Sequence, residues 1–234
     1  MKRLVKSHQQ HFLKHTGLIA ELIGHSTIRP RDTVVDIGAG SGAITAVLAH
    51  RACQVIAYEN EPAAAKKLRN NMRQFKNVEV IEEDFLKSPL PTVPYKVFAN
   101  IPFSQSSAIV RRLTDAQVAP RAIYLIVQKQ FARKLLVESD YFHGALGISI
   151  APWWQARIRR PLRRTDFTPP PAVDTVLLEL KPREPALLAP EQRTLFGSFV
   201  SRCYADPQFY ATCHAPQDKK PSQLQLSDWI TLFL

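Results

Sequence analysis

The tetrapeptide Asn100-Ile101-Pro102-Phe103 carries polar and aromatic groups that suit the capture of a nucleobase amine. The apolar residues before it, 97–99, predict the end of a buried strand. Pro102 ends the strand because it has no N–H, and the residue before a proline favours an extended backbone. The side-chain carbonyl of Asn100 and the backbone carbonyl of Ile101 are acceptors for an amine with two hydrogens, and the Phe103 ring can stack on a base. By itself, the tetrapeptide also fits an ordinary strand end followed by a turn.

A glycine-rich turn, Gly38-Ala39-Gly40-Ser41-Gly42, forms a second candidate site. The apolar residues 33–37 before it predict a buried strand, and residues 43–49 after it predict a helix. Strand, glycine turn and helix in this order are typical of a nucleotide-binding βαβ unit. The turn has the spacing GxGxG, which disfavours the GxGxxG pattern of NAD enzymes, and the chain has no Walker A lysine.

Polar side chains stand at the expected ends of the first four strands, namely Asp36, Glu59, Asp84 and Asn100. In a parallel sheet these ends share one edge, where open α/β folds bind their ligands. The set fits a small adenosine cofactor with a cationic sulfonium, which is S-adenosylmethionine. We expect Glu59 to hold the ribose hydroxyls and Asp84 to accept from the adenine amino group, with Phe85 beside the ring. Asp36 is expected to support the glycine turn, and each acid taken singly also fits a solvated loop charge.

The elements that position these groups alternate between strands and helices, which predicts a doubly wound, mainly parallel α/β sheet. Strands are expected at residues 33–37, 54–58, 78–81, 95–99 and 122–127, with two late strands at 145–154 and 173–180. Residues 1–15 are interpreted as a basic arm. Three prolines after Lys181 indicate a linker, and helices are expected at 192–204 and 224–234. We therefore predict a catalytic domain at 1–181 and a small helical domain at 182–234.

The formal net charge of +11, from 31 basic and 20 acidic side chains, favours a polyanionic partner such as nucleic acid. Five arginines fall within eight residues and are expected to contact RNA phosphates: Arg157, Arg159, Arg160, Arg163 and Arg164. The alternative is a solubilising surface. Three cysteines without a CxxC pattern disfavour a disulfide framework or a zinc site, so we expect a reducing compartment and no metal. The apolar runs are too short to span a membrane, and we expect no membrane association and no signal peptide.

The sequence resembles the rRNA adenine-N6 methyltransferases of the erythromycin-resistance (Erm) type, and also the related KsgA-type small-subunit rRNA dimethylases. The resemblance runs from about residue 9 to 181 and continues more weakly to the C-terminus. It is carried by segments 10–13 (QHFL), 36–45 (DIGAGSGAIT), 55–61 (VIAYENE), 84–85 (DF), 100–103 (NIPF), 124–136 (YLIVQKQFARKLL) and 167–180 (FTPPPAVDTVLLEL). Ile101 favours the Erm type, because KsgA-type enzymes usually have leucine there.

The resemblance implies a Rossmann-like methyltransferase that modifies an adenine of 23S rRNA and confers resistance to macrolides, lincosamides and streptogramin B. It implies cofactor contacts at His11, Leu13, Gly38, Gly40, Glu59, Asp84, Phe85 and Asn100. Target-base contacts are implied at Asn100, Phe103 and Phe167, together with Ile101 and Pro102 of the same turn.

The family often has asparagine at the position of His11 and glutamate at that of Asp36, and residues 202–214 lack the basic cluster expected there. We expect a cytoplasmic monomer that acts on naked or precursor rRNA. The alternatives are a housekeeping small-subunit rRNA dimethylase and a non-enzymatic nucleic-acid-binding protein on a methyltransferase fold.

Overall fold

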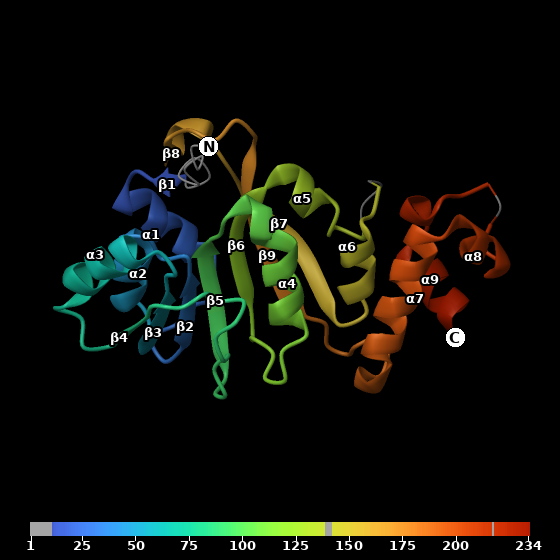
Figure 1. Ribbon diagram of the computed structural model, residues 1–234, viewed down its shortest axis with the longest axis horizontal. Coiled ribbons are helices and arrows are strands. Elements are labelled where there is room, and N and C mark those ends of the chain that lie inside the picture. The colour runs from blue at the N-terminus through green and yellow to red at the C-terminus, as the bar shows by residue number, and fades with distance from the viewer. Residues whose placement is uncertain (1–10, 139–141, 217) are drawn as a thin grey trace, which may run out of the picture. The chain divides into compact units, whose positions relative to one another are not determined.

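The computed structural model describes residues 11–138, 142–216 and 218–234. A seven-stranded sheet forms its centre, in the order β4-β3-β2-β5-β6-β9-β7 (Figure 1). The strands are β2 (Thr33–Ile37), β3 (Gln54–Tyr58), β4 (Val78–Ile81), β5 (Tyr95–Asn100), β6 (Ile123–Gln128), β7 (Trp154–Leu162) and β9 (Thr175–Pro182). The pairs β2–β3, β3–β4, β2–β5 and β5–β6 are parallel. The predicted doubly wound α/β fold is confirmed.

The strand order reverses beside β2, and this reversal fixes the place of the site. The chain runs from β2 outward through β3 to β4 and then returns to place β5 on the other side of β2. The register pairs Val35 with Val97 and Asn100 with Ile126. The carboxyl ends of β2 and β5 therefore flank the crevice at which open α/β sheets bind ligands.

Two short strands form a separate sheet near this edge, β1 (Phe12–Leu13) with β8 (Phe167–Thr168). They pair antiparallel, with Phe12 opposite Thr168 and Leu13 opposite Phe167. Residues 1–10 of the expected basic arm lie outside the described residues. For the remainder the expectation of an arm is wrong, because Leu13 is buried in the core.

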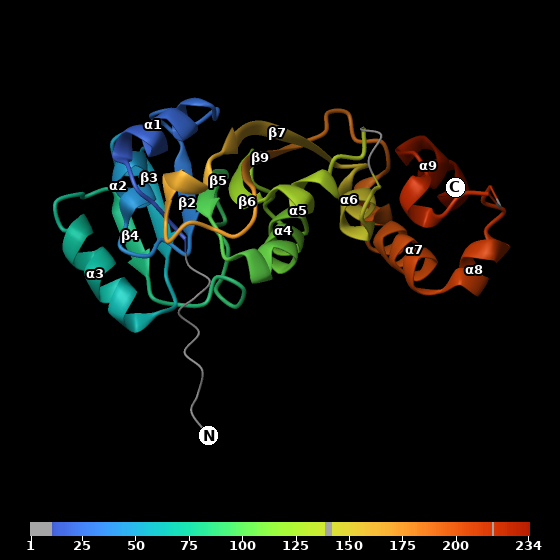
Figure 2. The same ribbon diagram turned by 90° about the horizontal axis from the view of Figure 1, so that it is seen from above.

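Helices cover the sheet (Figures 1 and 2), and its central strands β2, β3, β5 and β6 are buried on both faces. The core on one face joins Ile19 and Leu22 of α1 and Leu48 of α2 to Phe98 and Tyr124 of the sheet, whose rings stack with centroids 6.2 Å apart. Burial of each such side chain contributes about 1.5–3 kcal/mol. The helices are α1 (Thr16–Gly24), α2 (Ala43–Ala49), α3 (Pro62–Met72), α4 (Ser106–Thr114), α5 (Lys129–Arg133), α6 (Ala145–Ile150), α7 (Arg193–Ala205), α8 (Pro207–Thr212) and α9 (Leu226–Phe233).

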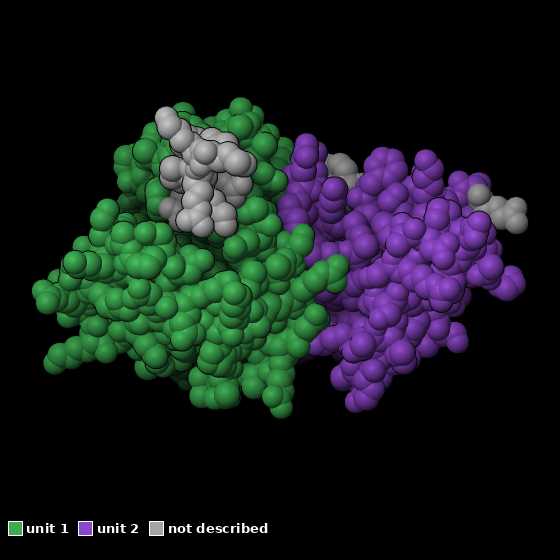
Figure 3. Space-filling view, in the orientation of Figure 1, with its two compact units in different colours: residues 1–129, 158–179 green, residues 130–157, 180–234 purple. Residues whose placement is uncertain are grey.

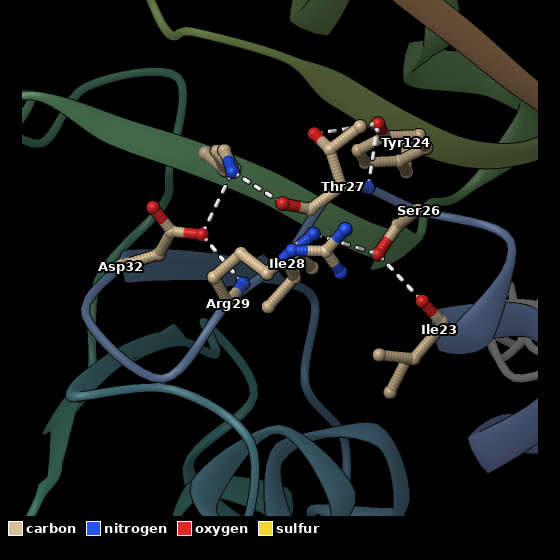
Figure 4. Close-up of polar contacts among 8 residues, drawn as sticks. Ile23, Ser26, Thr27, Ile28, Arg29, Asp32 and Tyr124 are labelled. Carbon is tan, nitrogen blue, oxygen red and sulfur yellow. Dashed lines mark hydrogen bonds and ion pairs between the residues drawn. The ribbon is translucent and has the colours of Figure 1, made fainter.

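An ion pair at the amino end of β5 anchors the connection between α1 and β2. The Lys96 ammonium donates to Asp32 Oδ2 at 2.7 Å and to the backbone oxygen of Thr27 at 2.5 Å. Thr27 in turn donates its backbone N–H to the Tyr124 hydroxyl at 3.0 Å (Figure 4). Both charged side chains are 11% exposed, so the pair is largely removed from solvent. It lies at the end of β5 opposite to Asn100 and stabilises the sheet without taking part in the site.

The late part of the chain departs from the sequence prediction. Residues 145–150 form helix α6, and the strand begins only at Trp154. A short apolar run that is buried all round does not distinguish strand from helix by its periodicity. Gly147 permits the close packing of α6, because a Cβ there would lie 2.3 Å from the backbone oxygen of Lys134. The expected helices near 192–204 and 224–234 are confirmed as α7 and α9, whereas the sequence pattern does not predict α8.

The chain divides into two compact units (Figure 3). One contains residues 1–129 and 158–179, and the other contains residues 130–157 and 180–234. In the second unit the buried His143 accepts from the Tyr204 hydroxyl through its backbone oxygen, and its Nδ1 donates to the Leu224 oxygen at 3.0 Å. The domain boundary at residue 181 stays a prediction.

Candidate active site

A pocket opens at the crevice between the ends of β2 and β5 and brings together most of the predicted site residues. Its wall includes His11, Leu13, Gly38, Glu59 and the stretch Asn100, Ile101, Pro102 and Phe103. A second pocket contains Asp84 and Phe85 and shares Gly38, Asn60 and Pro102 with the first. The two pockets thus follow the same sheet edge from the β1 segment to the loop after β4.

The glycine turn after β2 needs residues without a side chain. Gly38 and Gly40 have φ values of +68° and +58°, in the left-handed region that glycine adopts without strain. A Cβ on Gly40 would also lie 3.0 Å from Cε1 of Phe12. Both Gly38 and Ala39 donate their backbone N–H to the Tyr58 oxygen, at 2.9 and 3.0 Å. The turn is therefore fixed against β3 and leaves its open side to the pocket.

Glu59 stands at the end of β3 with its carboxylate held in place. Its Oε2 accepts from the backbone N–H of Gly40 at 2.8 Å, and its Oε1 accepts from the backbone N–H of Glu61 at 2.9 Å. The residue is 3% exposed and lines the pocket. Each oxygen keeps acceptor capacity, so a fixed pair of acceptors faces the pocket, as the binding of two vicinal hydroxyls requires.

Asp36 is a second buried acid in the same pocket. The sequence predicts that it supports the glycine turn, and the structure also places its carboxyl group at the pocket wall. Its Oδ2 accepts from the Thr45 hydroxyl at 2.7 Å, while its Oδ1 has no hydrogen-bond partner among the described residues. Burial raises the pKa of Asp36 to about 7, the Thr45 hydrogen bond opposes this, and the charge of Glu59 adds to it. A buried oxygen without a partner beside a pocket is a position that a ligand donor can satisfy.

The donor set of this pocket fits S-adenosylmethionine. That cofactor carries a sulfonium and an ammonium cation together with two ribose hydroxyls. Two buried carboxyl groups, Asp36 and Glu59, offer the opposite charge and the acceptors, and the turn at Gly38 admits close approach of a backbone. Among the described residues, no group of three or more His, Cys, Asp or Glu side chains is arranged to hold a metal ion.

Asn100 is oriented by a contact that local sequence patterns do not reveal. Its Nδ2 donates to the backbone oxygen of His11 at 2.6 Å, across 89 positions of the chain. This contact commits the donor end of the amide and leaves Oδ1 as an acceptor. His11 is itself held, because its Nδ1 donates to the Pro169 oxygen at 2.8 Å, and its ring lies 5.8 Å from that of Phe103.

Phe167 lies apart from the other predicted base contacts. Its side chain is 0% exposed and belongs to the hydrophobic core, and its backbone pairs with Leu13. In this conformation its ring is not available to a stacked base. By contrast, Phe12 is 46% exposed and lines the pocket, although the sequence pattern gives it no role.

Asp84 and Phe85 lie in the loop after β4. Asp84 Oδ1 accepts from the backbone N–H of Leu86 at 3.0 Å, which fixes the carboxylate at the second pocket. Phe85 is 5% exposed and packs edge-on against Tyr58 with ring centroids 5.3 Å apart. The expected pair of an acceptor and a ring is therefore present, with the ring largely buried beneath the loop.

Three of the five predicted RNA-binding arginines lie in β7, Arg163 follows that strand, and Arg164 begins the short 3-10 helix Arg164–Asp166. The expectation that all of them lie between two strands is wrong, because Arg157, Arg159 and Arg160 are part of β7. Within the described part of the chain, three of the five face acids: Arg159 with Glu179 at 3.7 Å, Arg164 with Asp174 at 3.4 Å, and Arg160 with Glu21. Much of this positive charge is therefore compensated within the protein.

No helix in the described ranges is both long and apolar enough to cross a membrane.

The family model "Ribosomal RNA adenine dimethylase" matches residues 1–206.

Two curated relatives, both named ribosomal RNA small subunit methyltransferase A, cover most of the chain. The protein of Levilactobacillus brevis is 32% identical over 210 residues, which are 86% of this chain and 71% of that protein. The protein of Streptococcus pneumoniae serotype 2 is 31% identical over 212 residues, covering 84% and 73%.

Two solved structures are similar over nearly the whole chain. The 23S rRNA methyltransferase ErmE has a TM-score of 0.80 and 27% identity, covering 95% of this chain and 98% of that one. A dimethyladenosine transferase from Plasmodium falciparum has a TM-score of 0.79 and 22% identity, covering 95% and 96%, and supports the fold alone.

Proposed function

This chain belongs to the ribosomal RNA adenine dimethylase family, and from that premise we propose that it transfers methyl groups from S-adenosylmethionine to the N6 amine of an adenine in ribosomal RNA. The observation that carries the proposal is the orientation of Asn100. Its donor end is bound to the His11 oxygen at 2.6 Å, so its acceptor end is available beside the Ile101 carbonyl and the Phe103 ring. These groups match an amine with two hydrogens on a flat base.

The residues proposed to hold the cofactor follow the two adjoining pockets. Glu59 accepts from the ribose hydroxyls, and Asp84 accepts from the adenine amino group in the second pocket. Gly38 and Gly40 shape the turn that passes close to the ligand, and His11 and Leu13 close the first pocket from the β1 side. When bound, the cofactor supplies an electrophilic methyl group on its sulfonium.

The chain's own contribution to the reaction is positioning and polarisation. The lone pair of an adenine N6 is delocalised into the ring, which makes it a poor nucleophile. Acceptance of its hydrogens by Asn100 Oδ1 and the Ile101 oxygen favours a pyramidal nitrogen whose lone pair points at the methyl group. The base must leave its helix to reach the pocket, and stacking on Phe103 holds it there. Alignment of the reacting atoms then supplies much of the rate, and the product sheds its proton to water.

The rRNA of the small subunit is the substrate that the relatives favour. The sequence alone predicts 23S rRNA, with small-subunit rRNA as the alternative. The curated relatives at 29–32% identity are named small-subunit methyltransferases, and this supports the alternative better. We propose small-subunit rRNA, in naked or precursor form, as the first candidate substrate. We further propose that the protein acts on it as a monomer in the cytoplasm.

Large-subunit rRNA, with resistance to macrolides, lincosamides and streptogramin B, is the second candidate. The likeness to ErmE covers 98% of that chain, whereas the alignment covers 71% of the Levilactobacillus protein. Ile101 favours the same candidate, as the sequence indicates.

Transfer of labelled methyl groups to separately purified small- and large-subunit rRNA tests the activity and its target. We expect Asn100→Ala to abolish transfer while the protein stays folded, because the residue ends a strand outside the core and the loss of its hydrogen bond to His11 costs only about 0.5–1.5 kcal/mol. Phe103→Ala should lower transfer by roughly one to two orders of magnitude, as the loss of about 1–3 kcal/mol of stacking implies, and Phe103→Tyr should stay active. The exposed Asn70→Ala on α3 is the control.

The result also separates the competing functions. Full activity of Asn100→Ala would refute the proposed role of the tetrapeptide. A wild-type protein that binds rRNA but binds no S-adenosylmethionine would instead indicate a non-enzymatic RNA-binding protein. Mapping of the methylated adenine, together with susceptibility testing of a host with the gene, separates the two rRNA targets.

A further inference from the structure

The side chain of Arg112, on helix α4, reaches the loop that carries Asp84 and Phe85. Its Nη2 donates to the backbone oxygen of Ser88. Its guanidinium carbon lies 5.7 Å from the centroid of the Phe85 ring, a cation–π distance. One side chain therefore contacts both the aromatic residue of the loop and the loop's far end.

Ser88 links this contact to Asp84. The backbone oxygen of Asp84 accepts from the Ser88 N–H and from the Ser88 hydroxyl, each at 3.0 Å, and from the Lys87 N–H at 2.8 Å. Ser88 is 2% exposed, so these bonds are shielded from water. The loop is closed on itself by Asp84, and Arg112 ties the closed loop to α4. The Tyr58 hydroxyl adds a further bond, to the Pro89 oxygen at 3.0 Å.

Helix α4 also begins at the other half of the site. Residues Phe103–Gln105 form a 3-10 turn, and α4 follows directly from Ser106 to Thr114. Gln105 and Pro102 line the same pocket as Asp84 and Phe85. The helix that starts at the predicted target-amine stretch thus carries, two turns later, the side chain that holds the adenine loop.

We propose that Arg112 is a positioning residue that fixes Asp84 and Phe85 for the adenine ring of the cofactor and so sets cofactor affinity. The inference rests on the proposed function, which assigns that ring to the second pocket. Removal of the guanidinium frees the Ser88 oxygen and the Phe85 ring, and the loop then samples conformations in which the Asp84 carboxylate is displaced. Only the fraction of molecules with a formed loop binds, so the apparent affinity falls by that fraction.

The test compares Arg112→Met with Arg111→Met, a matched control, because Arg111 is the exposed neighbour on the same helix. Calorimetry with S-adenosylmethionine should give a dissociation constant raised on the order of tenfold for Arg112→Met and an unchanged value for the control. Arg112→Lys, which can still donate to Ser88, should lie between the two. The Michaelis constant for rRNA and the turnover number at saturating cofactor should stay close to wild type.

Hydrogen exchange of the cofactor-free protein gives an independent readout. The amides of Lys87 and Ser88, which donate to Asp84, should exchange faster in Arg112→Met than in Arg111→Met, while strand amides of β5 and β6 should not change. Equal exchange at Lys87 and Ser88 in the two variants would overturn the proposal even if cofactor affinity differed. A general loss of protection in the strands would mean that Arg112 supports the whole fold, which also contradicts a specific positioning role.

A double-mutant cycle with Asp84→Asn shows whether Arg112 acts through Asp84. If it does, Arg112→Met should weaken binding much less in the Asp84→Asn background than in wild type, because coupled residues are not additive. Fully additive effects would refute the coupling. A wild-type protein that fails to bind S-adenosylmethionine would refute the proposed function itself, and the exchange data would still report on the loop.

Discussion

Replacement of Asp36 by asparagine should remove a pH dependence from the stability of the protein. Burial raises the pKa of this carboxyl group from 3.8 to about 7. Between these values the folded state binds a proton that the unfolded state has released. The free energy of unfolding therefore falls as the pH rises through this interval. The stabilisation that the protonated Asp36 contributes is fully present below the pKa of the unfolded state. It is lost as the pH rises through the pKa of the folded state.

The magnitude follows from the size of the shift. At about 1.4 kcal/mol per pH unit, a shift of about three units amounts to roughly 4 kcal/mol. Roughly 3 kcal/mol of this falls between about pH 5 and pH 7. The carboxyl group is fully buried, so solvent screening reduces this value little. Asparagine stays neutral and still accepts from Thr45, and any packing cost that it adds is the same at every pH.

Urea unfolding of the cofactor-free protein at several pH values measures the effect. Relative to wild type, Asp36→Asn should gain stability steadily up to about pH 7 and no further above it. Thr45→Val should extend the pH-dependent loss of stability to higher pH, because the Thr45 hydrogen bond lowers the pKa of Asp36. If the unfolding free energies of wild type and Asp36→Asn depend on pH in the same way, burial does not raise the pKa of Asp36 and the argument is refuted.

A cationic ligand beside Asp36 would draw the proton away. S-adenosylmethionine carries such charges, so its binding near pH 6 should release a proton, and the measured heat should depend on the ionisation enthalpy of the buffer. Asp36→Asn should show no such dependence. Release of a proton in both proteins would assign the linkage to another group and would refute the role of Asp36.

Three further predictions follow from other parts of the structure. Glu59→Ala should weaken S-adenosylmethionine binding, because each lost charge-assisted hydrogen bond is worth about 1.5–3 kcal/mol; unchanged affinity by calorimetry would exclude the ribose role. Arg157→Ala with Arg163→Ala should reduce the slope of log affinity against log salt by roughly 0.7–0.9 for each phosphate that the protein no longer neutralises; if rRNA titrations give the wild-type slope, these arginines only solubilise. Lys96→Met should cost about 3 kcal/mol in urea unfolding, because it leaves the Asp32 carboxylate buried without its cation; a loss of cofactor affinity at unchanged stability would contradict its purely structural place at the far end of β5.

The first half of the chain was predictable because its signals are local. The glycine turn follows its strand directly, and Glu59 ends the next strand, so the strand register alone brings Gly40 and Glu59 to the same edge. In a parallel sheet, the carboxyl ends of neighbouring strands lie at the same edge. The expectation that Asp36 supports the turn stays a prediction. Its burial and its oxygen without a partner among the described residues are properties of packing that a sequence pattern does not display.

The second half was less predictable because its elements are buried on all sides. In residues 145–150, Leu146, Ile148 and Ile150 alternate with small residues, and nearly all of these positions are buried, so the pattern suits a short core helix as well as a strand. The arginines suggested a connecting loop, yet residues 154–162 form an edge strand whose exposed positions carry Arg157 and Arg159. Charged residues at an edge strand are a common protection against pairing with other chains. The proposed contact with RNA phosphates and the protection of the sheet edge are therefore compatible in the same side chains.

The orientation of Asn100 depends on pairs of residues that are far apart in sequence. Asn100 donates to His11, His11 donates to Pro169, and between them β1 pairs with β8. These contacts close only after residues from the beginning, middle and later part of the chain have folded onto the sheet. The glycine turn and Glu59, by contrast, are complete within one βαβ unit. The glycine turn and Glu59 of the proposed cofactor site are therefore properties of local sequence, whereas the proposed base site is a property of the assembled fold, and the two meet where the strand order reverses.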